Sequence, residues 1–440
     1  MVRKHLACLA LGAFALSACG RDAPTEVGGS LLPGGSVRTY ELVLDAPSFL
    51  LSDTVVTGFR KVFGAGFFIV ADRYGGAVDA NVLGQWSAAP PSITVLDSAG
   101  TTRTDTLPRY IGGRLVLQLD TTQATPVSPV KLTTYRLTEA WDPASVSWTS
   151  RVDTTGAQLA WQTPGGTRGA RIDTATWSAG SDSVAFRVDS ATFRALTDTA
   201  AGPVRGVVVV AETNGARLKA TSLLLRGLAR PTTVNKDTTV TTSVGPEAVT
   251  MVSNPPPPAP THLRVGGLPP WRSYLHFAEG LRNLTVPCPG TTSGCSIRLD
   301  RTTINYAALL LDPLPAPAGF LLEDSLRMSA ANLNVSPLLP LARSPLGVQV
   351  GGTPKPIPSA RFASGASGGP VEVTVTPFVE ALVADTTQPG SANAPTRYMA
   401  LVQIPEPFTF GFADFYGRAA GAHAPRLRLI VTVASEVQLP

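Results

Sequence analysis

Apolar and polar residues alternate with a period of two along much of the chain, whereas a helical period is nearly absent. Because successive side chains of a strand point to opposite faces, this alternation predicts β-strands with one buried face. The clearest alternating runs are 114–120, 184–189, 371–376, 408–412 and 426–431. Two further runs, Val207–Ala211 and Leu223–Leu225, are continuously apolar, which is typical of strands buried on both faces.

Turns rich in Gly, Pro, Asp, Asn and Ser separate these runs, so the pattern predicts an all-β sandwich architecture. The order of the predicted elements is also repeated. A strand, a short helical turn, a loop, an apolar strand and a final strand follow one another in 186–226 and again in 373–433. Two copies of one fold explain this repetition most simply.

A boundary between the two copies is expected between residues 228 and 261. Residues 238–242 could form the first strand of the following unit, and Asn254–Pro258 reads as a stiff, extended spacer. We therefore predict two tandem antiparallel β-sandwiches of jelly-roll type. Their expected ranges are 37–231 and 232–440, with a Pro-rich segment at 254–260.

The first twenty residues read as an export signal. Arg3 and Lys4 precede an apolar run of about ten residues, which is too short to span a bilayer. The run ends in Leu-Ser-Ala-Cys-Gly, the pattern of a bacterial lipobox in which Cys19 is acylated and becomes the first mature residue. The alternative is an ordinary secretory signal with an incidental cysteine. We predict a signal peptide at 1–18, palmitoylation of Cys19 and a flexible tether at 19–36.

No other apolar stretch approaches the roughly twenty residues of a membrane helix, so we expect the lipid to be the membrane anchor. Gly20, rather than an acidic residue, follows the cysteine. Under the sorting rule of bacteria with two membranes, this favours the outer membrane. The sequence thus predicts a lipid-anchored cell-envelope protein.

Composition agrees with short strands and many turns. Hydrophobic residues make up 44% of the chain and charged residues 15%, with 41 Gly and 39 Pro. The net charge of +5 becomes +3 when Arg3 and Lys4 leave with the signal, and the arginines are scattered without a basic run. Because this charge is too dilute for a nucleic-acid footprint, we expect no nucleic-acid partner.

Cysteine usage supports export. After cleavage, Cys288 and Cys295 would be the cysteines of the folded part, and they flank a Gly- and Pro-containing turn whose ends can meet. In an oxidising compartment this pair predicts a disulfide that stabilises the fold by about 2–3 kcal/mol. A metal site would need two more ligands from the remaining histidines, so we expect no metal there. Those histidines are His262, His276 and His423.

Several short motifs resemble the DNRLRE-domain family, exported bacterial β-sandwich domains of which some are classed as carbohydrate-binding modules. They are the strand residues Leu115, Leu117 and Leu119, the Trp-containing segments 137–143, 146–149 and 161–166, and the closing Pro425–Leu427. The Trp stretch is missing from the second half, and the family's namesake hexapeptide is absent. The resemblance implies a jelly-roll fold and a role at the outer surface.

Three tryptophans carry the one functional hint of the sequence: Trp141, Trp148 and Trp161. Exposed indole faces could stack on a sugar ring, while Glu139, Asp142 or Arg151 held its hydroxyl groups. The alternative is a core role, because residues seven apart on one strand face opposite sides. A sugar platform requires at least two exposed indoles on one side of the first sandwich.

Other candidate chemistry is weaker. Gly365–Gly369 matches the G-x-S-x-G elbow with Ser367 as nucleophile, but that motif needs a strand before it and a helix after it, and this segment reads as a loop. His423 is expected to be a solvated turn residue. The carboxylate pairs Glu139/Asp142 and Glu323/Asp324 have no separation that the sequence can show.

A structural Ca²⁺ is an open alternative for the carboxylates in turns and at strand ends, although no loop of fixed ligand spacing is present. These carboxylates are Asp72, Asp79, Asp97, Asp105 and Asp120. No other cofactor is expected.

Together these features predict a non-enzymatic, lipid-anchored surface binding or adhesion module, with a polysaccharide or an envelope protein as its partner. The alternative is a structural stalk or scaffold that holds a partner protein. An accessory to a polysaccharide-directed enzyme comes third.

Overall fold

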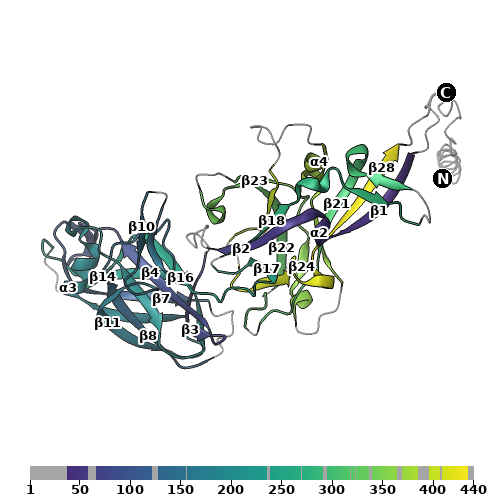
Figure 1. Ribbon diagram of the computed structural model, residues 1–440. Helices are drawn as coiled ribbons and strands as arrows, with labels where there is room; N and C mark the ends of the chain where they lie inside the picture. Colours follow the sequence, from purple (N-terminus) through teal and green to yellow (C-terminus); the bar gives the residue numbers. More distant parts are fainter. Residues whose placement is uncertain are drawn as a thin grey trace, which may run out of the picture.

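The computed structural model describes residues 37–57, 66–120, 127–154, 156–234, 238–268, 270–290, 295–317, 319–322, 324–335, 339–363, 369–384, 396–406 and 409–434. Strands predominate, helices are short, and the strands form two β-sandwiches joined by apolar contacts (Figure 1). The predicted all-β architecture is confirmed.

The first sandwich is built from the middle of the sequence. Its elements are β3 (Phe68–Tyr74), β4 (Val78–Trp86), β5 (Ile93–Leu96), β6 (Thr102–Asp105), β7 (Arg109–Leu119), β8 (Val130–Leu137), β9 (Ser150–Asp153), β10 (Gln158–Ala160), β11 (Arg168–Trp177), β12 (Ser183–Asp189), α3 (Ser190–Thr197), β13 (Val207–Ala211), β14 (Ala216–Arg230), β15 (Val240–Val244) and β16 (Pro246–Ser253).

Ten of these strands form one sheet that folds over into two layers. One layer is β11-β8-β13-β4 with β16 paired to β4, and the other is β3-β14-β7-β12 with β15 paired to β14. Side chains of both layers meet in one core, where Val82 and Val209 of the first layer join Leu117, Phe186 and Leu225 of the second. The alternating pattern along β7 and β12 therefore marks the faces turned into this core.

β13 is buried on both faces, as its continuous apolar run predicts. Val207 and Val209 point into the main core, whereas Val208 and Val210 pack against an apolar cluster on the outside of the same layer. Each face of this strand is therefore covered by apolar side chains.

The second sandwich uses both ends of the described chain. Its elements are β1 (Val37–Asp45), α2 (Ala46–Phe49), β2 (Leu50–Thr57), β17 (His262–Gly266), β18 (Trp271–Phe277), β19 (Thr285–Pro287), β20 (Ser296–Arg298), β21 (Thr303–Leu311), β22 (Ser325–Leu333), β23 (Leu346–Gln349), β24 (Pro356–Pro358), β25 (Val371–Thr374), α4 (Thr376–Ala384), β26 (Tyr398–Gln403), β27 (Phe412–Tyr416) and β28 (Arg426–Ala434).

A four-stranded sheet, β1-β28-β21-β25, packs on an eight-stranded sheet in this second unit. The larger sheet has the order β23-β22-β26-β18-β17-β27, with β2 paired to β18 and β24 paired to β22. Leu42, Leu309 and Leu429 from the small sheet share a core with Leu275 and Leu401 from the large one. The two sheets thus enclose a single core, as in a sandwich.

The predicted tandem order is wrong. β1 pairs with β28 and β2 pairs with β18, so residues 37–57 belong to the second sandwich and not to the first. β15 and β16 pair with β14 and β4, which places residues 240–253 in the first sandwich and not in the second. The first sandwich is therefore inserted between β2 and β17. Alternation predicts that a strand exists, but it does not identify the strand's partner.

The predicted order of elements recurs in the two sandwiches, and the strand pairing around it, which the sequence did not predict, is also similar. In the first sandwich β12 and β14 flank β7, and α3 follows β12; in the second, β25 and β28 flank β21, and α4 follows β25. After each helix comes a strand of the opposite layer, β13 or β26. The two units thus share one local topology.

The two sandwiches meet around Tyr74, at the end of β3. Its ring lies 5.7 Å from the rings of both Phe320 and Phe410, and its hydroxyl donates a hydrogen bond to the carbonyl oxygen of Gly319 at 3.0 Å. Arg343 of the second sandwich also forms an ion pair with Asp153 of the first. The junction is therefore both apolar and polar.

The described chain ends lie at one extremity of the molecule. Val37 pairs with Ala434 at the outer end of the small sheet, and the first sandwich lies beyond the opposite side of the second (Figure 1). No described helix is long and apolar enough to cross a membrane.

Candidate functional site

The Trp-containing segment between β8 and β11 folds back over the outer surface of the first sandwich. Trp141 is 6% exposed and Trp161 is 5% exposed, and both belong to one apolar cluster with Leu83 and Val208 of the layer beneath them; Trp148 is half-buried against the same cluster. A sugar platform needs two exposed indoles, and at least two of these three are buried. The prediction of a Trp platform is therefore wrong, because tertiary packing places the indoles against the sheet.

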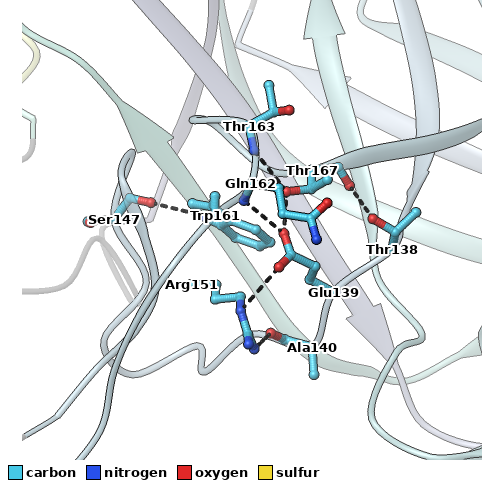
Figure 2. Close-up of polar contacts among 9 residues, drawn as sticks. All are labelled: Thr138, Glu139, Ala140, Ser147, Arg151, Trp161, Gln162, Thr163 and Thr167. Atoms are coloured by element: carbon cyan, nitrogen blue, oxygen red, sulfur yellow. Dashed lines mark hydrogen bonds and ion pairs between the residues drawn. The ribbon is translucent and has the colours of Figure 1, made fainter.

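Glu139 holds this segment together (Figure 2). Its carboxylate accepts hydrogen bonds from the backbone N–H of Gln162, at 3.1 Å, and from the hydroxyl of Thr167. Its other oxygen lies 3.3 Å from Nε of Arg151, whose guanidinium also donates to the carbonyl oxygen of Ala140 at 3.0 Å. Glu139 and Arg151, predicted as sugar ligands, thus link distant parts of one loop.

Further contacts fix the same loop. The indole N–H of Trp161 donates to the carbonyl oxygen of Ser147 at 3.0 Å (Figure 2). Gly165 has a φ of 84°, and a Cβ at this position would lie 2.7 Å from the Trp148 ring, so a larger residue would be excluded here. The carboxylate of Asp142 accepts the hydroxyl hydrogen of Ser145 and the backbone N–H of Ala144. These contacts have a structural role. We call the set centred on Glu139, with Arg151, Gln162 and Thr167, the Glu139 clasp.

The cysteine pair lies as predicted. The Cα atoms of Cys288 and Cys295 are 5.3 Å apart and their sulfur atoms lie at bonding distance. The backbone N–H of Cys288 donates to the carbonyl oxygen of Cys295 at 3.1 Å, which continues the β19–β20 hairpin. The disulfide closes this hairpin against the core of the second sandwich.

Replacing both cysteines with Ala is expected to lower the free energy of unfolding by about 2–3 kcal/mol, because the crosslink restricts the unfolded chain. Chemical denaturation with and without a reducing agent measures this effect. The parent should lose stability on reduction, whereas the double variant should not respond. Mass spectrometry of an unreduced digest that shows both thiols free would contradict the assignment.

The turn carboxylates proposed for Ca²⁺ are engaged separately. Asp97 binds its own turn through the N–H groups of Ala99 and Thr101, and Asp79 accepts the N–H of Arg73. Asp120 forms an ion pair with Lys219. Within the described ranges, no group of three or more His, Cys, Asp or Glu is arranged to hold a metal.

Asp105 is buried and binds a loop rather than an ion. Its carboxylate accepts hydrogen bonds from the N–H groups of Thr232 and Thr233 at 2.6 Å, Val234 at 3.0 Å and Leu107 at 3.0 Å. Burial by itself would raise the pKa of Asp105, but the hydrogen bonds from Thr233 and Val234 lower that pKa to about 2. This carboxylate therefore stays ionised and anchors the segment that leads to β15.

The remaining catalytic candidates form no common site among the described residues. Ser367 and Glu323 lie outside the described residues. His423 is exposed as predicted, and its ring nitrogen Nδ1 lies 3.1 Å from Oδ2 of Asp312 while the ring stacks on Tyr416. These contacts place His423 in a surface turn before β28.

The structure also reveals a cavity of about 420 Å³ at the open side of the second sandwich. β22 pairs with β24 up to Arg327 and with β23 from Ala331, so Met328–Ala330 face the cavity where strand pairing is interrupted. Residues 351–358 also line the cavity, and the edge strand β25 forms a further part of its wall. The cavity thus lies between the edges of the two sheets.

The charged side chains of its lining are Glu372, Arg361 and Lys355. Glu372 accepts hydrogen bonds from the Tyr306 hydroxyl and from Nη1 of Arg428, both at 3.1 Å. Arg361 donates to the backbone carbonyl oxygens of Gly369 and Pro370, and Lys355 is exposed at the rim. The cavity therefore presents two cationic side chains and one paired carboxylate. The sequence signal that could have located it is the Gly- and Pro-rich run at 351–358.

Comparisons with known proteins assign no family. No protein-family model matches the chain, and no curated protein matches it. Among solved structures, a Faustovirus major capsid protein aligns at 9% identity over 92% of this chain and 90% of that chain, with a TM-score of 0.08. A likeness at this TM-score carries no argument about fold or function.

Proposed function

We propose that this protein is a non-enzymatic, lipid-anchored cell-envelope protein that presents its inserted sandwich for binding at the surface. The observation that carries the proposal is the arrangement of the two units. The described N-terminus, Val37, lies at the far end of the second sandwich, and the first sandwich lies on the opposite side (Figure 1).

The chain between the predicted anchor, Cys19, and the second sandwich is short. Val37 lies 18 residues after Cys19, and an extended chain of that length reaches at most roughly 60 Å. A lipid on Cys19 would hold the second sandwich near the membrane and leave the first sandwich on the side away from it. Binding surfaces on the first sandwich would then face outward from the membrane.

Replacing Cys19 with Ser is expected to yield an uncleaved or soluble species that no longer fractionates with the membranes. The physical reason is that the several acyl chains of a lipoprotein supply the membrane affinity, and one chain alone binds only marginally. Fractionation followed by immunoblotting measures the distribution.

Cys8→Ser is the matched control, because Cys8 lies inside the predicted signal and outside the lipobox. This variant should remain with the membranes like the parent. A Cys19→Ser protein that fractionates with membranes as the parent does would refute the anchor.

A further inference from the structure

Three exposed arginines lie side by side on neighbouring strands of the first sandwich: Arg187 on β12, Arg114 on β7 and Arg226 on β14. The register pairs Arg187 with Arg114, and Arg114 with Arg226. Directly opposed residues of antiparallel strands point to the same side of a sheet, and neighbouring strands lie about 4.8 Å apart. The three guanidinium groups therefore form one row across three strands.

A second pair extends this surface along the same strands. Arg109 of β7 is paired with Arg230 of β14, and both are exposed. Arg230 lies four residues after Arg226, which corresponds to roughly 13 Å along a strand. We call these five residues the arginine face: Arg109, Arg114, Arg187, Arg226 and Arg230.

The positive charge of the arginine face is not balanced by ion pairs. Among the described residues, none of its five guanidinium groups has a carboxylate partner. Two carboxylates on or beside β12 bind backbone groups: Asp189 accepts the N–H of Thr192 at 2.7 Å, and Asp173 accepts the backbone N–H of Arg187 at 2.6 Å. Because like charges directly opposite one another destabilise a sheet, the row costs stability unless an anion lies over it.

We propose that the arginine face binds a linear acidic glycan, an inference that rests on the proposed role as a surface binding protein. Guanidinium groups recognise carboxylate and sulfate groups through paired N–H···O contacts. The row runs across three strands, so it presents a line of cationic groups to a chain-like ligand. Carboxylated and sulfated glycans share this anionic chemistry.

The side chains among the arginines favour a glycan over a nucleic acid. Leu228 lies between Arg226 and Arg230, and Val116 and Leu224 flank the row on its other side; all three are half-buried aliphatic residues. Single-stranded nucleic acids are usually held by aromatic rings on which the bases stack. The nearby ring of Tyr110 is half-buried and stacked on Phe193, with 5.0 Å between centroids, so it does not supply such a platform.

The test compares two triple variants of the purified, detergent-solubilised full chain. Arg114→Gln/Arg187→Gln/Arg226→Gln removes the row, and Arg73→Gln/Arg103→Gln/Arg298→Gln removes three exposed arginines that have acidic partners, with the same loss of charge. Affinities are measured for polygalacturonate, dextran sulfate, neutral dextran and duplex DNA, each at two salt concentrations. Thermal unfolding of each variant checks its folding.

We expect the parent and the control variant to bind polygalacturonate or dextran sulfate, with an affinity that falls at higher salt. The row variant should bind roughly tenfold more weakly and be at least as stable as the parent, because the opposed like charges are gone. Comparing the affinities for polygalacturonate and dextran sulfate identifies which acidic group, carboxylate or sulfate, is preferred.

Three outcomes overturn the proposal: equal weakening in both triple variants, equal binding of neutral dextran, and row-dependent binding that is tighter for DNA than for either acidic glycan. Binding in detergent solution does not depend on anchoring. A failure here is therefore distinct from a failure of the Cys19 experiment.

Discussion

Replacing Asp414 with Asn is expected to lower the free energy of unfolding by about 3–5 kcal/mol, because it leaves a buried guanidinium without its counter-charge. Arg264 and Asp414 have side chains only 4% and 6% exposed, and they form a two-point ion pair with N···O distances of 2.6 and 2.7 Å. Arg264 also donates to the carbonyl oxygen of Pro256, and its guanidinium carbon lies 3.6 Å from the centroid of the Phe412 ring.

This position matters because Arg264 links several segments. β17 and β27 contribute the ion pair, and Pro256 belongs to the Pro-rich connection between the two sandwiches. Urea denaturation followed by intrinsic fluorescence measures the loss. A double variant, Arg264→Met/Asp414→Leu, should recover part of the stability, since it removes both buried charges together.

Asp300→Asn is the matched control for this prediction. Asp300 pairs with Arg298 through two contacts, but the Arg298 side chain is 45% exposed. An exposed pair contributes at most about 1 kcal/mol. Similar losses for Asp414→Asn and Asp300→Asn would show that burial does not set the cost.

Replacing Trp161 with Ala is expected to cost about 3–5 kcal/mol, the usual cost of removing a large buried aromatic side chain. The indole is 5% exposed, packs on the outer face of β13 and β4, and donates a hydrogen bond to Ser147. Its loss would leave a cavity under the Glu139 clasp. Denaturation curves for the first sandwich, followed by circular dichroism, measure the effect.

Leu159→Ala provides the comparison from the same hairpin. Leu159 is 42% exposed, so its truncation should change the stability by no more than about 0.5 kcal/mol. Trp161→Ala should also leave glycan binding at the arginine face unchanged under conditions where the protein remains folded. A Trp161→Ala protein that is as stable as Leu159→Ala would refute the clasp.

Local sequence patterns predicted many of the elements, but the run at 408–412 was wrong: of its described residues, 409–412, only Phe412 lies in a strand, β27. The run at 207–211 coincides with β13, the run at 184–189 lies within β12, and the run at 426–431 lies within β28. Alternation and continuous apolarity report how many faces of a strand are buried, which is a local property. The disulfide was predictable for the same reason, because its two cysteines are seven residues apart.

The candidate site could not be predicted in the same way. Tryptophan spacing left both a core role and a platform open, and the choice depended on Leu83 and Val208, which lie far from Trp141 and Trp161 in sequence. The carboxylate of Glu139 looked available in sequence, but residues up to 28 positions away bind it. Burial and hydrogen bonding of a loop depend on what the loop folds against.

The sequence by itself determined the strands, their buried faces, the repeated element order and the hairpin disulfide, since each depends on residues close together in the chain. Only the tertiary structure decided that residues 37–57 complete the second sandwich, and that Arg114, Arg187 and Arg226 form one row. The physical reason is that strand pairing joins residues separated by tens to hundreds of positions. Register then determines which side chains become neighbours, and scattered arginines become a continuous charged surface.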